Sequence, residues 1–348
     1  MILYQQDEQA FNTNGLGILS DCTKCAVERE LNGMYALEME YPTAGIHAEK
    51  IVTGCIILVP PDPYSRPQPF RIWKTRRKRS SNKISVWARH IAYDAEGTTV
   101  LRFEAEGAAD SADMINNVSV YERPVRVTTN KASSAIMRQE KPKSMMKSVI
   151  GSEGSFVDTF GGEIEMDFFA IRILERIGTD NHVTIRPGKN LTDAEIEVNA
   201  EKYFSGVYPF WEKDGVYVTC GRLDSKAPSG TKGTLTLDLT DEFDSEPAPT
   251  ALQTRAERYI RENDIGKISV AMTVNLKSLE TEPGMEWMMP LERVQLGDTV
   301  RVILDNPQTL AESRVVAVSY DPLANRYNHV SVGEIKKSLA GYIAGIGG

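Results

Sequence analysis

The sequence predicts an α+β, β-rich fold, with strand-rich regions at both ends and a centre that mixes helices and strands. Three observations support this prediction. Apolar and polar residues alternate with a period of two over much of residues 1–90, which is typical of strands with one buried face. The same alternation returns over residues 268–333. Between these regions, short segments have helical spacing and residues that commonly start helices.

A chain of 348 residues is long enough for about two or three domains. We divide it into an N-terminal β-rich domain (1–95) that later segments can complete, a mixed α/β middle region (96–230), and a second β-rich domain with one helix (231–335). The glycine-rich tail, residues 336–348, is interpreted as a C-terminal linker.

Composition and charge exclude some classes of function. The net charge of −8 does not favour non-specific binding of nucleic acid by the protein as a whole. No run of 18 or more apolar residues is present, so we expect no membrane span. The start, MILYQQDEQAF, lacks a basic segment followed by an apolar run, and we expect a strand there rather than a secretion signal.

The N-terminal strands follow from alternation. In MYALEMEYP, the side chains of Tyr35, Leu37 and Met39 fall on one face of a strand, and those of Glu38 and Glu40 fall on the other. Each such strand offers one apolar face to a core.

A hairpin is predicted in PFRIWKTRRKRSSNKISVWARH. Phe70 and Ile72 lead into it, Val86 and Ala88 lead out, and the basic loop Lys74 to Lys83 forms its tip. Such a loop can bind nucleic acid or lie solvated at the surface. One short run on an acidic chain favours the solvated loop, and the sequence does not assign it a role.

Helices are expected in the middle region. One is predicted from Ser111 to Val118, with Asp110 or Ser111 as its N-cap. A second, polar helical stretch followed by a linker is predicted in KASSAIMRQEKPKSMMKSVIG.

The stretch EGSFVDTFGGEIEMDFFAIRILERIGTDNHVTIRPGKNL combines glycines, alternating acids and a Gly-Lys pair. Glu163, Glu165 and Asp167 alternate with apolar residues, which predicts a strand, and Ile171 and Ile173 can continue in a second strand. A helical interpretation of DFFAIRILERIG stays open, because its apolar residues also recur near a period of four; we favour strands.

The C-terminal elements have clear turn and helix signals. Asp214-Gly215 predicts a hairpin turn in YPFWEKDGVYVTCGRL. SEPAPTALQTRAERYIRENDIGK predicts a helix that starts at Pro249 and Thr250 and ends at Gly266. Its buried stripe is expected to contain Leu252, Ala256, Tyr259 and Ile260. Strands are predicted in KISVAMTVNL and LGDTVRVIL, and a last pair surrounds a turn from Asp321 to Asn325.

No catalytic motif emerges from the glycines or the acids. A Walker loop needs a glycine five residues before Gly188-Lys189 and a Ser or Thr after it, but Val183 and Asn190 stand there. The acids at 163, 165 and 167 can in principle act as an acid–base pair. Carboxylates on the open face of a strand are more often solvated or directed at an assembly partner, and we favour that interpretation.

Histidines and cysteines also lack a functional pattern. The four histidines, His47, His90, His182 and His329, form no HExxH-type pair, and His90 is interpreted as a core or sheet-edge residue. Cys22 and Cys25 form a CxxC without the further ligands that zinc requires or the helix that a thioredoxin-like site requires. We interpret these two, with Cys55 and Cys220, as ordinary reduced cysteines.

Several segments together resemble the prophage tail protein family. They are LNGMYALEMEYP, QPFRIWK, ISVWARHIAYD, GSEGSFVDTFGGEIEMDFFAIRILERIG, VTIRPGKNL, VQLGDTVRVIL and SRVVAVSYDPLANRYNHVSVG, in this order, over residues 1 to 335. This family forms the N-terminal hub of siphophage tail-tip proteins, also called tail-associated lysins or prophage endopeptidase tail proteins. The resemblance implies a fold like the baseplate hub of contractile-tailed phages, with two β-barrel-like domains and intervening α/β domains.

The resemblance also implies a function and partners. Three copies would form a ring at the virion tail tip, assembled in the bacterial host cytoplasm, through whose channel DNA passes without specific binding. Its partners would be the distal tail and tail tube proteins, the tape measure protein and further tip components. Exposed aromatic residues are candidates for such interfaces, and each can equally belong to a core: Tyr64, Trp73, Tyr208, Phe210 and Trp211.

The resemblance carries over no catalytic, cofactor-binding or metal-binding residues, and we expect no enzymatic activity and no cofactor. Lytic or receptor-binding modules follow the hub in many members of the family, and this sequence ends where such a region would begin. Two alternatives stay open: a cell-wall peptidase or hydrolase of the tail, and a host-surface binding module.

Overall fold

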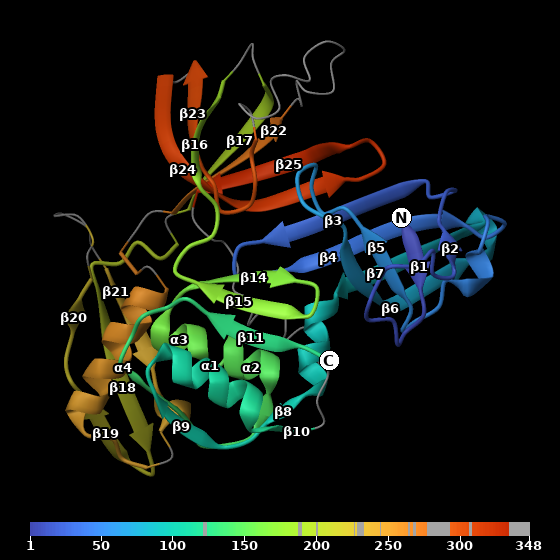
Figure 1. Cartoon of the computed structure of the whole chain (residues 1–348). Helices are drawn as coiled ribbons and strands as arrows, with labels where there is room; N and C mark the ends of the chain where they lie inside the picture. Colours follow the sequence, from blue (N-terminus) through green and yellow to red (C-terminus); the bar gives the residue numbers. More distant parts are fainter. Residues whose placement is uncertain are drawn as a thin grey trace. The chain divides into compact units, whose positions relative to one another are not determined.

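Figure 1 shows the structure, a computed structural model that describes residues 1–120, 124–186, 190–199, 201–225, 227, 233–243, 245–263, 265–266, 269–276, 293–305 and 308–333. The chain forms two compact units. Unit 1 contains Met1–Glu195 and Met272–Gly348, and unit 2 contains Ile196–Ala271. The boundaries predicted near residues 95, 230 and 335 stay predictions, and the predicted linker lies outside the described residues.

One large sheet dominates unit 1. Its strand order is β17-β22-β25-β24-β3-β4-β7-β6-β5-β1-β2, with β23 joining β16 to β24. The strands are β1 (Ile2–Tyr4), β2 (Gly17–Ile18), β3 (Lys24–Glu30), β4 (Tyr35–Pro42), β5 (Ile56–Val59), β6 (Gln68–Lys78), β7 (Lys83–His90), β16 (Asp180–Ile185), β17 (Leu191–Asn199), β22 (Ser269–Leu276), β23 (Thr299–Asp305), β24 (Gln308–Asp321) and β25 (Arg326–Gly333).

The alternating apolar and polar residues give this sheet one buried face and one face that is more exposed. The side chains of Tyr35, Leu37 and Met39 in β4 are buried, while that of Glu38 between them is exposed. The next strand, β7, pairs antiparallel with β4 and buries every second residue in the same way. The apolar face covers a core that continues into the middle region of the chain.

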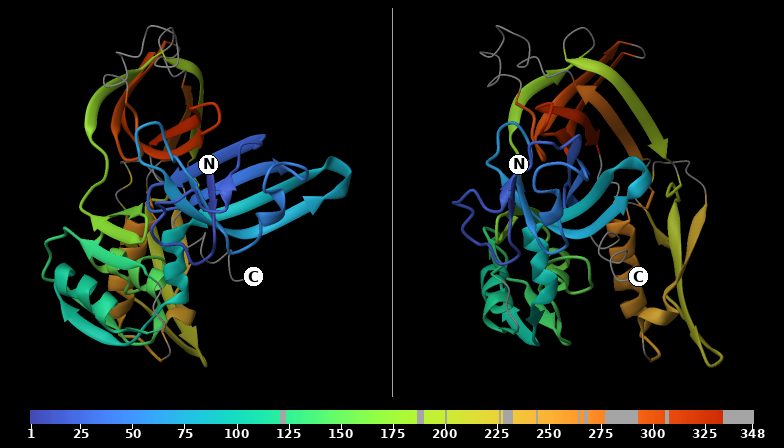
Figure 2. Two further views of the ribbon diagram at one scale, coloured as in Figure 1. Left: turned by 45° about the vertical axis from the view of Figure 1, so that its right-hand side comes forward. Right: turned by 90° about the vertical axis from the view of Figure 1, so that its right-hand side faces the viewer.

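The N-terminal and C-terminal strands meet in this sheet. β24 pairs antiparallel with β3, from Ala317 opposite Glu30 to Tyr320 opposite Val27. Together with β16, β23 and β25 it curls around a second core, rich in valine, which the left view of Figure 2 shows as a barrel-like arrangement. The predicted α+β, β-rich class is therefore confirmed.

The hairpin of β6 and β7 is confirmed, but its basic segment was wrongly assigned to a loop. β6 continues to Lys78, and only a short 3-10 turn, η2 (Arg79–Ser81), and Asn82 separate it from Lys83. Arg77 lies opposite Ile84, which is fully buried. Cross-strand packing therefore keeps a polar sequence in strand form.

The middle region contains short helices and small sheets. Its helices are η3 (Ile91–Gly97), α1 (Ala108–Asn117), α2 (Met145–Val149) and α3 (Phe156–Phe160), and the short η1 (Ala48–Lys50) lies earlier, between β4 and β5. The sheets are β10-β8-β13, β11-β15-β14 and β12-β9. Their strands are β8 (Thr99–Val100), β9 (Phe103–Glu106), β10 (Ser119–Val120), β11 (Arg126–Thr129), β12 (Ile136–Gln139), β13 (Lys143–Ser144), β14 (Glu163–Asp167) and β15 (Ala170–Leu174).

Two helix predictions need correction here. Helix α1 begins at Ala108, with Gly107 as its N-cap in place of Asp110 or Ser111; the Ser111 hydroxyl donates instead to the Gly107 carbonyl, at 2.7 Å. The predicted helical stretch after it contains the strand β12, because Met137 is buried and pairs with Ala105 of β9. The two-residue strand β13 and the short helix α2 follow it.

The strands β14 and β15 confirm the favoured interpretation of the acidic stretch, and the helical one is wrong. Ile164 lies opposite Ile173, and Met166 opposite Ile171, in an antiparallel pair. Phe168 has a φ of 50° and turns the chain between them. The acids at 163, 165 and 167 therefore share one face, as predicted.

In its described residues, unit 2 forms a four-stranded sheet covered by the helix α4. The elements are β18 (Gly206–Lys213), β19 (Val216–Thr219), β20 (Leu223–Asp224), β21 (Thr234–Asp238), η4 (Thr240–Glu242) and α4 (Pro249–Glu262). The Asp214-Gly215 turn is confirmed, with φ of 52° and 81°. Leu252 and Ala256 of α4 are fully buried, and Tyr259 and Ile260 are half-buried around the same core.

Candidate functional site

The three acids of β14 are held by cations of the same chain. Glu163 forms an ion pair with Arg314 of β24, whose Nη2 lies 3.0 Å from Glu163 Oε2. The same carboxylate oxygen accepts a hydrogen bond from the Ile177 amide, at 2.8 Å. Arg314 Nη2 also donates to the carbonyls of Ile177 and Gly297, at 2.9 Å each. Glu163 therefore joins three segments of unit 1.

Asp167 accepts hydrogen bonds from more side chains than Glu163 does. It accepts hydrogen bonds from Arg66 Nη2 at 2.7 Å, Gln68 Nε2 at 2.9 Å and Arg172 Nη2 at 2.6 Å. Burial opposes ionisation, but the hydrogen bonds from Arg66 and Gln68 and the charge of Arg172 outweigh it and lower the pKa of Asp167. Glu165 pairs with Arg172 at 2.9 Å. A carboxylate held ionised in this way is a poor proton donor or acceptor near neutral pH.

His90 is a core residue, as predicted. Its side chain is fully buried, its Nδ1 accepts from the Ala92 amide at 3.3 Å, and its Nε2 lies 3.1 Å from Gln68 Oε1. These contacts select the neutral tautomer that donates from Nε2. The ring stacks on Tyr35 with centroids 4.4 Å apart. Burial, helped by the nearby Arg29 charge, lowers the pKa of His90 to about 3. Both nitrogens are therefore occupied by structural contacts.

Asp62 forms a further buried centre that the sequence analysis did not predict. It is 2% exposed and accepts from Arg29 at 3.0 Å, from the Ser65 amide and hydroxyl at 2.7 Å each, and from Gln295 at 3.3 Å. Arg29 also lies over the Tyr35 ring, 4.8 Å from its centroid. The motif Asp-x-Tyr-Ser after two prolines is typical of an Asx turn and was the available signal.

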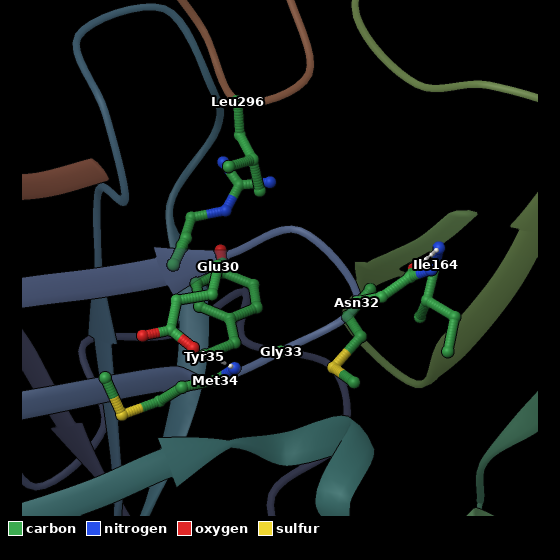
Figure 3. Close-up of a pocket in the computed structure, with 9 residues that line it drawn as sticks. Glu30, Asn32, Gly33, Met34, Tyr35, Ile164 and Leu296 are labelled. Atoms are coloured by element: carbon green, nitrogen blue, oxygen red, sulfur yellow. Dashed lines mark hydrogen bonds between the residues drawn. The ribbon is translucent and has the colours of Figure 1, made fainter. Parts of the chain in front are cut away.

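A small pocket lies beside this network (Figure 3). Its volume is about 20 Å³, which is room for about one water molecule and none for a substrate. Glu30, Met34 and Leu296 line it, and Asn32 links it to β14 through a 2.7 Å hydrogen bond from the Ile164 amide. The pocket is therefore a packing gap at the meeting point of β3, β4 and β14.

Two wider hollows are shallow and lie in separate places. One, of about 480 Å³, is lined by residues 4–16 of unit 1, where the Glu8 carboxylate accepts from the amides of Ala10 and Phe11. The other, of about 550 Å³, lies in unit 2 between Tyr217 of β19 and the segment that enters α4. Neither lining contains a histidine or cysteine.

The cysteines are free thiols. Cys22 and Cys25 lie in contact, and the hydrogen bond between them lowers the pKa of Cys22 and raises that of Cys25, which is also buried. In the part of the chain that the structure describes, no group of three His, Cys, Asp or Glu side chains is arranged to hold a metal ion. The His182 side chain and Gly188-Lys189 lie outside the described residues.

The predicted interface aromatics separate into three groups. Trp211 is 3% exposed and belongs to the core of unit 2, where its Nε1 donates to the Phe243 carbonyl at 3.3 Å. Trp73 of β6 is 47% exposed. The other three, Tyr64, Tyr208 and Phe210, are half-buried.

Trp73 belongs to a row of cations and rings on the outer face of the β6–β7 hairpin. Arg89 lies over Trp73 at 4.6 Å, Lys74 lies over Trp87 at 4.8 Å, and Arg76 lies over Trp87 at 5.4 Å. Among the described residues, no helix is long and apolar enough to cross a lipid bilayer.

Comparison with known proteins adds a likeness of fold. No protein-family model matches the chain, and no curated protein matches it by sequence. Among solved structures, the prophage tail protein gp18 of Listeria monocytogenes EGD-e aligns with a TM-score of 0.59 and 14% identity, over 99% of this chain and 97% of that one. The 43 kDa tail protein of prophage MuSo2 from Shewanella oneidensis aligns with a TM-score of 0.61 and 14% identity, over 89% and 94%.

A third structure, a tail protein of Neisseria meningitidis MC58, aligns with a TM-score of 0.56 and 12% identity, over 92% of this chain and 94% of that one. The match covers both units and the connections between them in sequence, rather than one common sheet motif. This protein therefore has the fold of the prophage tail proteins.

Proposed function

We propose that the protein is a structural component of a phage or prophage tail tip, a hub whose copies form a trimeric ring between the tail tube and the distal components. The observation that carries this proposal is the likeness to three prophage tail proteins over almost the entire chain. Fold alone does not establish function. The order of the resembling sequence segments supports the same conclusion independently.

The chemistry of the candidate residues supports a structural role. The acids proposed as a catalytic alternative are ion-paired with Arg66, Arg172 and Arg314, and they connect strands of unit 1. A hydrolase needs an acid or base whose pKa lies near the working pH. The lowered pKa of Asp167 is unfavourable for that role.

The partners and location follow as parts of the same proposal. In the virion tail, the ring would contact the distal tail protein and the tail tube on one side, the tape measure protein, and further tip components on the other side. Assembly would take place in the host cytoplasm, and DNA would pass through the channel without sequence-specific contacts.

The first experiment is the solution mass of the purified chain, measured by light scattering after size exclusion over a range of concentrations. A mass three times that of the monomer supports the ring, because closed cyclic assemblies are common among homo-oligomers. A monomer at every concentration contradicts self-assembly of the hub.

A second experiment addresses hydrolysis directly. The purified chain is incubated with purified peptidoglycan, and soluble fragments are measured over time. We expect no release above a buffer control. Release that disappears in Glu163→Gln or Glu165→Gln would instead assign the chain to the cell-wall hydrolases.

A further inference from the structure

The β6–β7 hairpin carries an unusual concentration of positive charge. The basic arm, defined as Lys74–Lys83, contains six of the 40 basic residues of the chain, and no acidic residue occurs from Gln68 to Ala92. The rest of the chain therefore has 34 basic and 48 acidic residues, a net charge of −14. Figure 2 shows this hairpin, in light blue, extending beyond the neighbouring strands.

Some cations of the basic arm have partners within the chain. Lys83 pairs with Glu40 at 2.7 Å, and Arg77 donates to the carbonyls of Ala48 and Ile51, at 2.9 and 3.3 Å. By contrast, Lys74, Arg76 and Lys78 are exposed and form no ion pair with any described carboxylate. Lys74 and Arg76 are held over the Trp87 ring, which orients their charges at little entropic cost on binding.

A pair of acidic residues lies on β3 and β4, the strands that follow β7 in the sheet. Glu28 of β3 and Glu38 of β4 project from the outer face of the sheet, because Ala26 lies opposite Glu38 and Ala36 opposite Glu28. The pKa of Glu28 is raised by burial and by the negative charge of Glu38, although His329 and Lys24 partly offset this. The two carboxylates repel each other, so a cation placed beside them would be stabilising.

We propose that the basic arm of one copy docks on the acidic pair, Glu28 and Glu38, of a second copy. This inference rests on the proposed ring, and it names the surfaces that build it. The arm and the acidic pair are neighbouring patches on the outer face of one sheet, because Glu38 lies opposite Trp87. A contact from the arm of one copy to the acidic pair of the next is heterologous, and a threefold rotation between copies would close it into a ring. Trp73 lies exposed beside the arm, and Arg89 lies over its ring. Tryptophan and arginine are common among the residues that contribute most to binding at interfaces.

Charge reversal tests this contact. Arg76→Glu with Lys78→Glu reverses the arm, and Glu28→Lys with Glu38→Lys reverses the acidic pair. Each double variant is expected to weaken self-association at low salt by about tenfold or more, as like charges replace opposite ones. The chain that carries all four changes should associate again, because each reversed surface then meets its reversed partner. Self-association is measured by sedimentation velocity over a range of concentrations.

The matched control is Arg102→Glu with Lys141→Glu, which changes the net charge equally at two exposed positions away from the arm. It should leave self-association unchanged. The neutral variant Arg76→Gln with Lys78→Gln, whose fold is checked by its thermal unfolding, separates loss of attraction from new repulsion or misfolding. It should weaken association less than the charge reversal does.

Three results would overturn the inference. If the wild-type chain forms trimers that neither reversal weakens, the ring proposal stands and the contact lies elsewhere. If the wild-type chain is a monomer at every concentration, both proposals fail. If a short fluorescein-labelled DNA duplex binds the wild-type chain, and the arm reversal abolishes that binding while self-association is unchanged, the arm is a nucleic-acid site instead.

Discussion

At the scale of single residues, His90 connects burial to the pH dependence of stability. Its pKa is about 3 in the folded protein and about 6.5 in an unfolded chain. The pKa of the folded state is lower than that of the unfolded state. The contribution of neutral His90 to the free energy of unfolding is therefore fully present above about pH 6.5 and is lost as the pH falls towards 3. At pH 5 the wild-type protein should have a free energy of unfolding about 2 kcal/mol lower than at pH 7 from this group alone. Urea unfolding of wild type and His90→Phe measures the difference, which the variant should lack. An equal pH dependence in both proteins would contradict a buried neutral histidine.

At the same scale, a substitution of Glu163 tests how much its ion pair with Arg314 stabilises the fold. Its side chain is 15% exposed and that of Arg314 is 28% exposed, so removing one charge leaves the other partly buried without its partner. Glu163→Gln should lower the free energy of unfolding by about 2 kcal/mol. The control is Glu104→Gln, which breaks the exposed pair with Arg138 and should cost less than about 1 kcal/mol. Equal losses, measured by urea unfolding at one pH, would show that the Glu163 pair is no more than a surface contact.

At the scale of elements, the strands of the β6–β7 hairpin should stabilise the fold, whereas its turn, residues 79–82, should contribute little. Lys78 lies opposite Lys83, so replacing residues 79–82 by Asn-Gly would close the hairpin with a two-residue turn. This change should alter the free energy of unfolding by less than about 0.5 kcal/mol and keep one cooperative transition for unit 1. Ile84→Ala in the same hairpin should cost about 2–4 kcal/mol, because Ile84 is fully buried. Loss of cooperative unfolding in the turn variant would mean that the basic turn belongs to the folding core.

At the scale of the whole molecule, the two units have separate cores. Unit 2 has its own core around Val207, Trp211 and Leu252, distinct from the cores of unit 1. Leu252→Ala should remove about 2–5 kcal/mol from unit 2, as the side chain is fully buried. Differential scanning calorimetry of the full chain should then show an early transition for unit 2 and an unchanged later transition for unit 1. A single transition that moves as one would show that the units unfold together.

The extent to which this fold can be predicted differs between its elements. Alternation predicted β4 and β7, and Pro249 and the apolar stripe predicted α4, because these signals act within one element. The start of α1 and the strand β12 were missed, because Gly107 is a weak cap signal and Met137 is placed by its partner strand β9. At β12, tertiary pairing outweighed the local propensity for helix.

The sequence by itself determined the alternating strands such as β4, β7 and β14, the Asp214-Gly215 turn and the long helix α4, since periodicity and turn chemistry are local properties. Its resemblance to prophage tail proteins pointed to the fold that the comparisons then showed. Only the tertiary structure decided what the acids of β14 do. Glu163 and Arg314 are 151 residues apart, and Arg66 and Asp167 are 101 apart. No local spacing relates such pairs; they meet because β24 joins β3 and β14 packs beside them, which is a property of the folded chain alone.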